Sequence, residues 1–283
     1  MGSVMALKDI LVIVDDTPQA AARIDVAVTL ATDHDAHLTG LCVSAPAVVP
    51  SYLETYLTDS MRAAYQAEED GRMARAEQRF MDCLRRAGRL ERSEWRAVGG
   101  YPIDVAAVHA RYADLVVVGQ LDPATEFALP AVEPETLMFE CGRPVLVVPY
   151  VGHFPTVGQR VLVGWNGGRE AARAVADALP LLERARAVTV LAVNTDPGGA
   201  GEADDPGVDI AGHLARHGIA AEAAHFISEP HEVGDTLLNT TTDLSCDLIV
   251  MGAYGRSRLR SLVLGSLTGF ILEHMTVPVL LSH

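Results

Sequence analysis

Glycine residues near the carboxyl end of the chain follow an apolar run with a spacing that suits phosphate binding. The apolar run, residues 248–251, leads into Gly252-Ala253-Tyr254-Gly255 and, nine residues later, into Gly265-Ser266. Glycine permits positive φ and close approach of the backbone to an anion, and a helix that opens at Ser266 would offer free amide groups and a positive dipole end. A strand, a glycine loop and a helix start therefore predict a phosphate cradle and a nucleotide ligand. The alternative is a set of loop glycines and a serine N-cap with no ligand.

The elements that must position this loop occur twice along the chain. Residues 9–16 and 19–31 match residues 159–167 and 170–182, and each pair is an apolar strand that runs into a helix. Short apolar strands that alternate with helices predict parallel sheets covered on both faces. The fold class is therefore α/β, with two tandem Rossmann-like domains, each a five-stranded parallel sheet with helices on both faces. The strands are expected at 8–14, 38–43, 94–99, 114–119, 144–149, 160–165, 187–193, 221–227, 247–252 and 278–282.

The predicted domain boundary lies in residues 150–159, which carry Pro155 and two glycines and no periodic pattern. It separates a first repeat at 1–150 from a second at 157–283. Between their second and third strands the repeats carry different inserts. Residues 52–92 predict one long or two shorter surface helices, either a partner surface or, as we favour, a solvated helix that covers the sheet. Residues 196–209 predict a mobile acidic loop.

The charge balance limits the kinds of partner. The chain has 283 residues, with 22 Lys plus Arg against 37 Asp plus Glu, which gives a formal charge of −15. Such a surface opposes binding to nucleic acid and to anionic membranes. The sequence contains no apolar stretch of membrane-spanning length, and its first nine residues lack the features of a signal peptide. We therefore expect a cytoplasmic protein that binds neither nucleic acid nor membrane.

Cysteine and histidine residues give no sign of a metal site. Cys42, Cys83, Cys141 and Cys246 are scattered without a CxxC pair, and buried free thiols are the favoured interpretation. The segment at residues 33–37 has the residue types of metal ligands, but its place between a helix and a strand favours a polar turn. A pair at His213 and His217 has no third ligand nearby in the sequence. We predict no metal site, and no catalytic residue stands out.

In an open parallel sheet, a ligand lies beyond the carboxyl ends of the strands, where the strand order reverses. In the second repeat this rule selects residues after the first, second and fourth strands. The glycine amides and the Ser266 hydroxyl would hold phosphate or ribose oxygens, Arg256 would add charge, and the Val193 backbone would face an adenine edge. The predicted site comprises Trp165, Asn166, Gly167, Val193, Met251, Gly252, Gly255, Arg256, Gly265, Ser266 and Leu267.

The GxxGx9GS run, its flanking MG and VLGSLT, and the doubled architecture resemble the universal stress protein family in its tandem two-domain form. The resemblance covers nearly the whole chain. It implies an adenine nucleotide α-hydrolase-like fold with ATP as the cofactor, held by the loop glycines and Ser266, with Met251 and Val193 against adenine. Where the ATP-binding members carry Asp after the first strand, this chain has Asn166, whose amide brings no charge for Mg²⁺.

The first repeat departs further from that pattern. Aligning Gly119 with Gly252 places Asp122 opposite Gly255 and Glu133 opposite Ser266. Carboxylates in those places repel phosphate, and three prolines interrupt the loop and remove amide donors. Although Asp15 keeps the acidic position of the family, we expect a degenerate repeat that supplies structure or binds a different ligand. We therefore predict one ATP per chain, bound within residues 157–283.

The leading functional prediction is an ATP-binding stress-response protein that acts as a nucleotide-dependent regulator or sensor. A slow ATP hydrolase or nucleotidyl-transfer enzyme of the same fold is one alternative, and a nucleotide-free scaffold is another. The final strands of the two repeats are short and apolar, so we expect them to pair within the chain as a pseudo-dimer. The sequence leaves open whether two chains form a homodimer and which proteins are partners.

Overall fold

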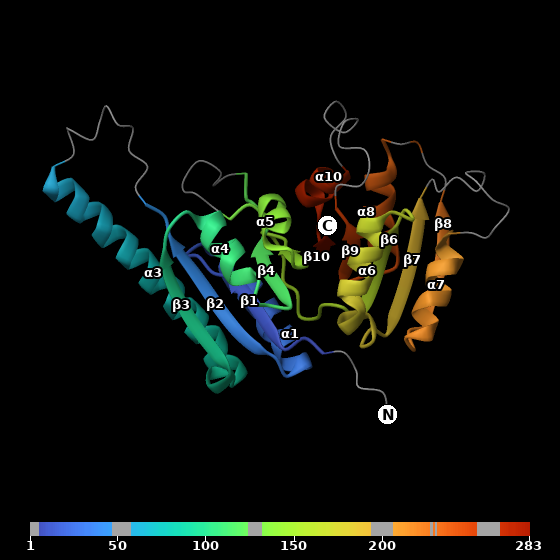
Figure 1. The fold of residues 1–283 in the computed structure, drawn as a ribbon, viewed down its shortest axis with the longest axis horizontal. Coiled ribbons are helices and arrows are strands. Elements are labelled where there is room, and N and C mark those ends of the chain that lie inside the picture. The colour runs from blue at the N-terminus through green and yellow to red at the C-terminus, as the bar shows by residue number, and fades with distance from the viewer. Residues whose placement is uncertain are drawn as a thin grey trace.

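The protein forms one continuous sheet flanked by helices (Figure 1). The computed structural model describes residues 6–46, 58–123, 132–193, 206–226, 229, 231–253 and 267–283. The strands are β1 (Asp9–Ile13), β2 (His37–Ser44), β3 (Ser93–Gly99), β4 (Leu115–Gly119), β5 (Val145–Val148), β6 (Arg160–Trp165), β7 (Ala187–Val193), β8 (Ala221–Phe226), β9 (Leu248–Gly252) and β10 (Val279–Ser282). The helices are α1 (Ala20–His34), α3 (Asp59–Ala87), η1 (Leu90–Arg92), α4 (Pro102–Ala110), α5 (Pro134–Cys141), α6 (Arg169–Leu182), α7 (Pro206–Arg216), α8 (Val233–Asp243) and α10 (Leu267–His274).

The strand order is β3-β2-β1-β4-β5-β10-β9-β6-β7-β8. Each half is a parallel five-stranded sheet, as the sequence predicts, and the predicted strands agree with the observed ones to within about a residue. The two halves meet where β5 and β10 pair antiparallel, with Leu146 opposite Leu280. This is the pairing expected of the final strands. This pairing joins the two parallel sheets into one ten-stranded sheet and covers the edges of β5 and β10 that would otherwise be exposed.

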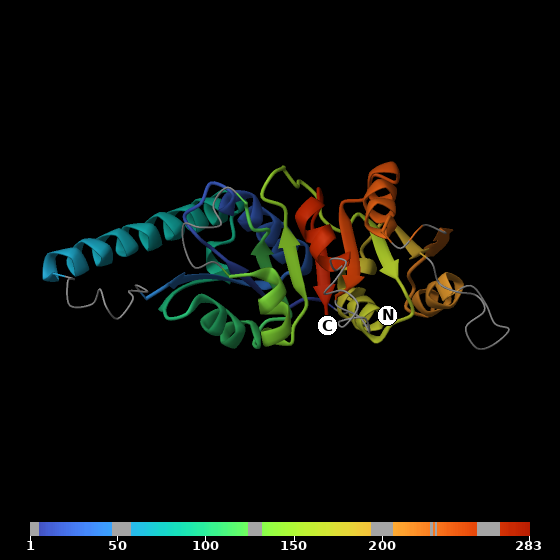
Figure 2. The same ribbon diagram turned by 90° about the horizontal axis from the view of Figure 1, so that it is seen from above.

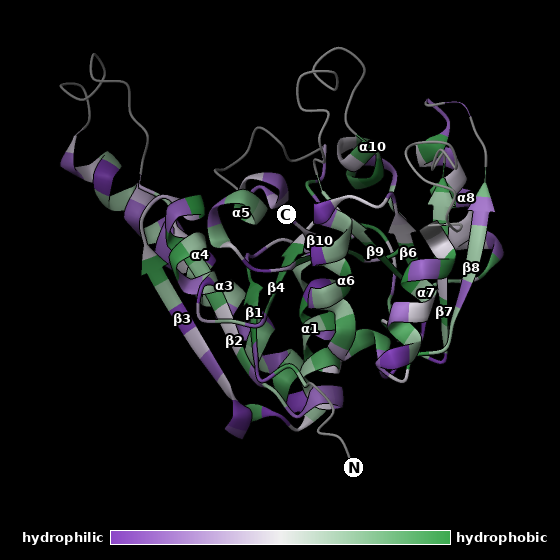
Figure 3. Cartoon of the chain, turned by 45° about the vertical axis from the view of Figure 1, so that its right-hand side comes forward, coloured by the Kyte–Doolittle hydropathy of each residue, from purple (hydrophilic) through white to green (hydrophobic). Residues whose placement is uncertain are grey.

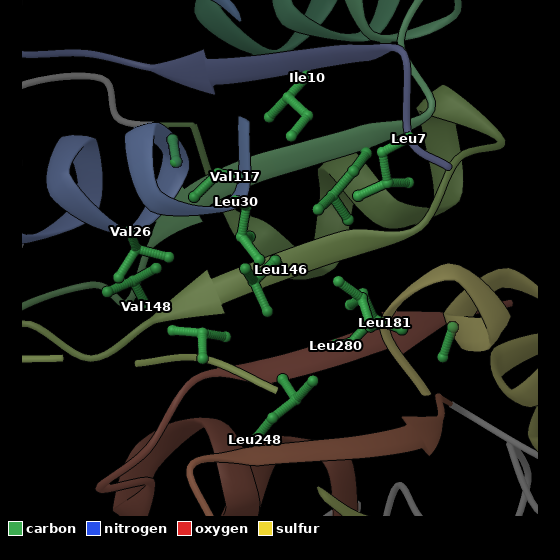
Figure 4. Packing of buried hydrophobic residues seen from close by; sticks show 14 of the residues in the cluster. Leu7, Ile10, Val26, Leu30, Val117, Leu146, Val148, Leu181, Leu248 and Leu280 are labelled. Atoms are coloured by element: carbon green, nitrogen blue, oxygen red, sulfur yellow. The ribbon is translucent and has the colours of Figure 1, made fainter. Parts of the chain in front are cut away.

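Successive side chains of each strand point to opposite faces, and helices cover both faces. On β1, Ile10 and Val12 belong to the buried cluster that also includes residues of α1, α3, α6 and α7, whereas Leu11 and Ile13 belong to the cluster on the other face with residues of α4, α5, α8 and α10. Figure 3 shows hydrophobic residues concentrated on the central strands and hydrophilic ones on the edge strand β3. One buried cluster crosses the seam between the halves, since it joins Leu146 of β5 to Leu181 of α6 and Leu280 of β10 (Figure 4).

Within the described residues, the insert of the first half consists of one long helix, α3, that extends beyond the sheet (Figure 2), followed by the short η1. The N-cap of α3, Thr58, accepts a hydrogen bond from the Met61 amide, and Gly88 ends the helix with a left-handed φ of 65°. The buried positions begin at Glu69, and all the buried apolar ones lie in the second half of the helix, where Phe80 packs under Gly40 so closely that a Cβ there would lie 2.8 Å from the ring. The helix therefore covers the sheet through one end and is solvated at the other.

The insert of the second half needs a correction. Residues 206–209 belong to helix α7, which begins at Pro206, and not to an acidic loop. Proline suits the first turn of a helix because its missing N–H is not needed there. The rest of the predicted loop lies outside the described residues. None of the helices in the part of the chain that the structure describes has the length and hydropathy needed to cross a bilayer.

Candidate functional site

The carboxyl ends of β9, β6 and β7 bring Met251, Trp165 and Val193 of the predicted site to one edge of the sheet. The strand order reverses between β6 and β9, where Gly164 pairs with Met251. On the other side of β6, Trp165 pairs with Ala192, so Val193 at the end of β7 lies at the same edge. This is the position at which open α/β sheets bind ligands. Met251 is only 4% exposed and forms part of the core beneath that edge.

Asn166 follows β6 and turns the chain toward α6. Its Oδ1 accepts a hydrogen bond from the Gly168 amide at 2.9 Å, and Gly167 between them adopts a positive φ of 68°. Asp15 makes the same turn in the first half, where its Oδ1 accepts from the Thr17 amide at 3.0 Å. The side-chain oxygen of Asn166 is thus already used locally, and an uncharged amide is a weak ligand for Mg²⁺. These residues do not fit a protein-bound Mg²⁺.

Gly252 has a packing role that the sequence does not reveal. A Cβ at this position would lie 2.3 Å from the Ala171 nitrogen and 2.3 Å from the Glu170 carbonyl carbon, both backbone atoms at the start of α6. Only glycine allows β9 and α6 to approach this closely. The predicted contact of Gly252 with a ligand remains a prediction.

The remaining predicted residues lie in or next to the glycine loop. Gly255, Arg256, Gly265 and Ser266 lie outside the described residues. Leu267 is the first residue of α10 and is 39% exposed. The helix that the sequence predicts after Ser266 is therefore present, with its amino end directly after the loop.

The first half holds a cavity of about 210 Å³ at the corresponding edge. It lies at the carboxyl ends of β1, β2, β4 and β5, where the strand order reverses between β1 and β4. Val43, Val118 and Val132 contribute apolar walls, and Asp15 and Gln120 contribute polar groups. The half that we expect not to bind ATP thus contains a well-formed cavity of its own.

Asp15 and Arg23 form an ion pair in this cavity, with 2.8 Å between Oδ2 and Nη2. The Arg23 side chain is 8% exposed and lies over Gly119, where a Cβ would be 2.2 Å from Nη1. Burial raises the pKa of Asp15, but the Arg23 charge and the hydrogen bonds from Thr17 and Arg23 outweigh it, so that the pKa stays below its ordinary value. Asp15 is therefore ionised at neutral pH.

A second ionic cluster ties α3 to the loop after β1. Arg72 Nη1 lies 2.6 Å from Glu69 Oε1, and its Nε lies 3.4 Å from Asp16 Oδ1. Arg75 adds a bond of 2.9 Å to the other Asp16 oxygen. Glu69 is almost fully buried, which it tolerates only because Arg72 compensates its charge.

The start of α5 leaves no place for an anion. Pro134 occupies the first turn and lacks an N–H, and Glu133 places its own carboxylate there, where it accepts a hydrogen bond from the Thr136 hydroxyl at 2.9 Å. The corresponding helix of the second half, α10, follows Gly265-Ser266 instead. The two halves therefore differ in the feature on which phosphate binding depends.

Comparison with known proteins identifies the family. The model of the universal stress protein family matches residues 6–149 and 158–283. The chain belongs to this family. It is 27% identical over 180 residues to the universal stress protein Slr1230 of Synechocystis, and that match covers 59% of this chain and 57% of the relative. The matched part thus spans little more than half of the relative's length.

Solved structures show the same fold at low sequence identity. A universal stress protein from Archaeoglobus fulgidus superposes with a TM-score of 0.72 at 15% identity, covering 97% of this chain and 95% of the other. A functionally unknown protein from Pseudomonas aeruginosa PAO1 superposes with a TM-score of 0.56 at 16% identity, covering 98% and 92%. Both likenesses concern the tandem architecture of this universal stress protein.

Several residues of these edges escape sequence reasoning. Arg72, Arg75 and Arg79 recur on one face of α3, a signal that this face meets acidic partners. Gln120 after β4 carries no such signal, yet its Nε2 donates to the Leu272 carbonyl of α10 at 2.7 Å. Glu170, buried beside Gly252, looks from the sequence like an ordinary first-turn acid.

Proposed function

We propose that the second half of this universal stress protein binds an adenine nucleotide, ATP, and that nucleotide occupancy regulates the protein in a stress response. The observation that carries the proposal is the convergence of β6, β7 and β9 at the point of strand-order reversal. The glycine loop follows β9 directly, and α10 begins directly after Ser266. A nucleotide at this edge would face three strand ends and the amino end of one helix.

Different residues of the chain would contact the adenine, ribose and phosphate parts of the nucleotide. Met251 and Val193 would border the adenine, with Trp165, Asn166 and Gly167 on the β6 side. The amides of Gly252, Gly255 and Gly265, with the Ser266 hydroxyl, would bind ribose and phosphate oxygens, Arg256 would offset charge, and Leu267 would start the helix that faces the phosphates. Any Mg²⁺ would accompany the nucleotide through phosphate oxygens, because Asn166 supplies no charge.

Retained nucleotide tests the proposal. The protein is denatured by heat and removed by centrifugation, and the supernatant is analysed by ion-pair chromatography. It should contain ATP or its breakdown products at close to one equivalent per chain. The variant Gly265→Asp adds a side chain and a negative charge before α10 and should lose the nucleotide while it keeps its fold.

Gly212→Asp is the matched control, because Gly212 lies exposed in α7 and nothing lies within 4 Å of a Cβ there. This variant should retain nucleotide like the parent. Equal retention by Gly265→Asp, with the fold intact, would make the loop structural only, and absence of nucleotide and of ATP binding in the parent would favour the scaffold.

Slow ATP hydrolysis is a second candidate because a carboxylate is present at this edge. Glu170 is 4% exposed beside Gly252, and its Oε1 accepts a bond of 2.6 Å from Arg169. Burial raises the pKa of Glu170, but Arg169 and the helix amide outweigh it and hold the pKa below its usual range. A carboxylate with a lowered pKa is a poor general base, so turnover should be slow. Glu170→Gln should then stop phosphate release and leave ATP binding intact.

A further inference from the structure

We propose that the cavity of the first half binds a small uncharged molecule with one ring and a hydrogen-bond donor, and that Gln120 couples this site to α10 of the second half. The binding site is independent of the proposed ATP site. The coupling rests on the proposed function, since it concerns the helix that follows the glycine loop.

The size of the cavity sets the size of the ligand. Pockets for drug-sized ligands measure about 300–1,000 Å³. The first-half cavity measures about 210 Å³, partly because Arg23 fills the space over Gly119. In the second repeat, the residue that aligns with Arg23 is Ala174. The described part of the cavity is therefore suited to a single ring.

Arginines pair with three of the four carboxylates that line the cavity. Asp15 pairs with Arg23 at 2.8 Å, Glu69 pairs with Arg72 at 2.6 Å, and Asp16 pairs with Arg75 at 2.9 Å. An anion would lose its hydration without gaining an unpaired cationic side chain among the described residues, which costs several kcal/mol, and a cation would compete with arginine for three of the four carboxylates. Anions are opposed further by Asp122, which accepts a hydrogen bond from Gln19 at 3.2 Å. An uncharged ligand has no such penalty.

The cavity lining offers both an apolar surface and a hydrogen-bond acceptor. Val118 and Val132 are buried and Val43 is half-buried, so they offer a surface on which a ring can pack. Asp15, which also lines the cavity, is ionised and its side chain is 37% exposed. A carboxylate oxygen accepts more than one hydrogen bond, so Asp15 can receive an O–H or N–H donor while it keeps Arg23.

Gln120 connects this cavity to the second half. It lines the cavity, and its Oε1 accepts a bond of 3.1 Å from the amide of Tyr150, which also lines it. Its Nε2 donates to the carbonyls of Leu272 and Glu273, at 2.7 and 3.2 Å, in the last turn of α10. A ligand that moves Gln120 or Tyr150 therefore moves the end of the helix that starts after Ser266. Through these hydrogen bonds of Gln120, the first half would have a regulatory role.

Three probes with the same ring and different charge test the site: benzyl alcohol, benzoate and benzylammonium. Methyl NMR of the full-length chain follows Val43, Val118 and Val132 during each titration. Benzyl alcohol should shift these methyl groups through the ring current, and each ion should bind at least tenfold more weakly, as a cost above 1.4 kcal/mol implies. Absence of benzyl alcohol binding, or equal binding of an ion, would overturn the proposal.

Cavity-filling variants control for binding elsewhere. Val43→Phe and Val132→Phe should each weaken benzyl alcohol binding tenfold or more. Val98→Phe is the matched control, because Val98 pairs with Val43 across β3 and β2 but lies outside the cavity. Two filling variants guard against misfolding of one of them. Undiminished binding by a folded filling variant would refute this location.

ATP titrations of the full chain, with and without saturating benzyl alcohol, test the coupling. The alcohol should change ATP affinity about fivefold or more, within the usual range of allosteric coupling. Gln120→Met keeps the side-chain length but has no donor, so it should abolish that change. Gln66→Met is the control, because Gln66 lies exposed on α3 and donates only to Asp70 among the described residues.

The failures of the two proposals are distinguishable. If the chain binds no ATP, the proposed function fails, and the methyl titration still decides the cavity. If ATP binds but benzyl alcohol leaves its affinity unchanged, or if Gln120→Met responds like the parent, the coupling is refuted.

Discussion

Gly252→Ala should destabilise the protein through a clash with the backbone of α6. The added Cβ would lie 2.3 Å from both the Ala171 nitrogen and the Glu170 carbonyl carbon. Ordinary contact begins at 3.4 Å, so α6 or β9 must withdraw by about 1 Å in an interior packed like a crystal. Backbone atoms at a helix start cannot swing aside as a long side chain can.

The expected cost is that of overpacking, about 1–3 kcal/mol, and each kcal/mol should lower Tm by roughly 2–4 °C in a chain of this size class. Urea unfolding followed by circular dichroism measures the free energy directly. Gly99→Ala is the matched control, since no atom lies within 4 Å of its Cβ. That control should match the parent or gain about 0.4–1 kcal/mol. Equal stability of Gly252→Ala and Gly99→Ala would show that the close approach is not needed.

Three other outcomes follow from the same structure. Phe80→Ala should lower the free energy of unfolding in urea by about 3–5 kcal/mol, because the fully buried Phe80 ring fills the space over Gly40. Phe226→Ala, at an exposed position, should lower it far less. Equal losses in the two variants would be inconsistent with the packing of α3. All four thiols are buried, and burial raises the pKa of Cys42 and of Cys83 to about 11. A thiol reagent at pH 8 should therefore label the unfolded chain within minutes but leave the native protein unlabelled. Rapid labelling of the native protein would refute the burial of the thiols. Because the pKa of Asp15 is lower in the folded state, ionised Asp15 stabilises the fold at pH values above its unfolded-state pKa near 3.8, and this stabilisation is lost as the pH falls through its folded-state pKa. The difference in unfolding free energy between the parent and Asp15→Asn should therefore be constant from pH 7 to 5 and shrink toward pH 3. A difference that does not change with pH would contradict the ion pair with Arg23.

The strands could be predicted because each is a short run of β-branched and aliphatic residues bounded by polar turns. The pairing of β5 with β10 followed from the same logic, since two short apolar strands need cover. Asn166 and Gly167 could be placed because strand ends in a parallel sheet share one edge. These inferences use local pattern and a general rule of topology.

Other features depend on partners that are distant in sequence. Arg72 meets Asp16 across 56 positions, and Gln120 meets Leu272 across 152, so no local pattern predicts either contact. Gly252 shows a different limit. A ligand and a closely packed helix both require glycine, and the sequence cannot distinguish the two demands. The sequence does not predict the first-half cavity, because the loss of the phosphate loop indicates only that this repeat supplies structure or binds a different ligand.

Methionine methyl NMR of the full-length chain during an ATP titration places the nucleotide directly. Met251 lies beneath the predicted site in the second half, and Met73 lines the cavity of the first half. ATP should shift the Met251 methyl group, leave Met73 unchanged, and saturate at one equivalent per chain. Saturation at two equivalents, or a shift of Met73 with Met251 unmoved, would contradict a single ATP site in the second half.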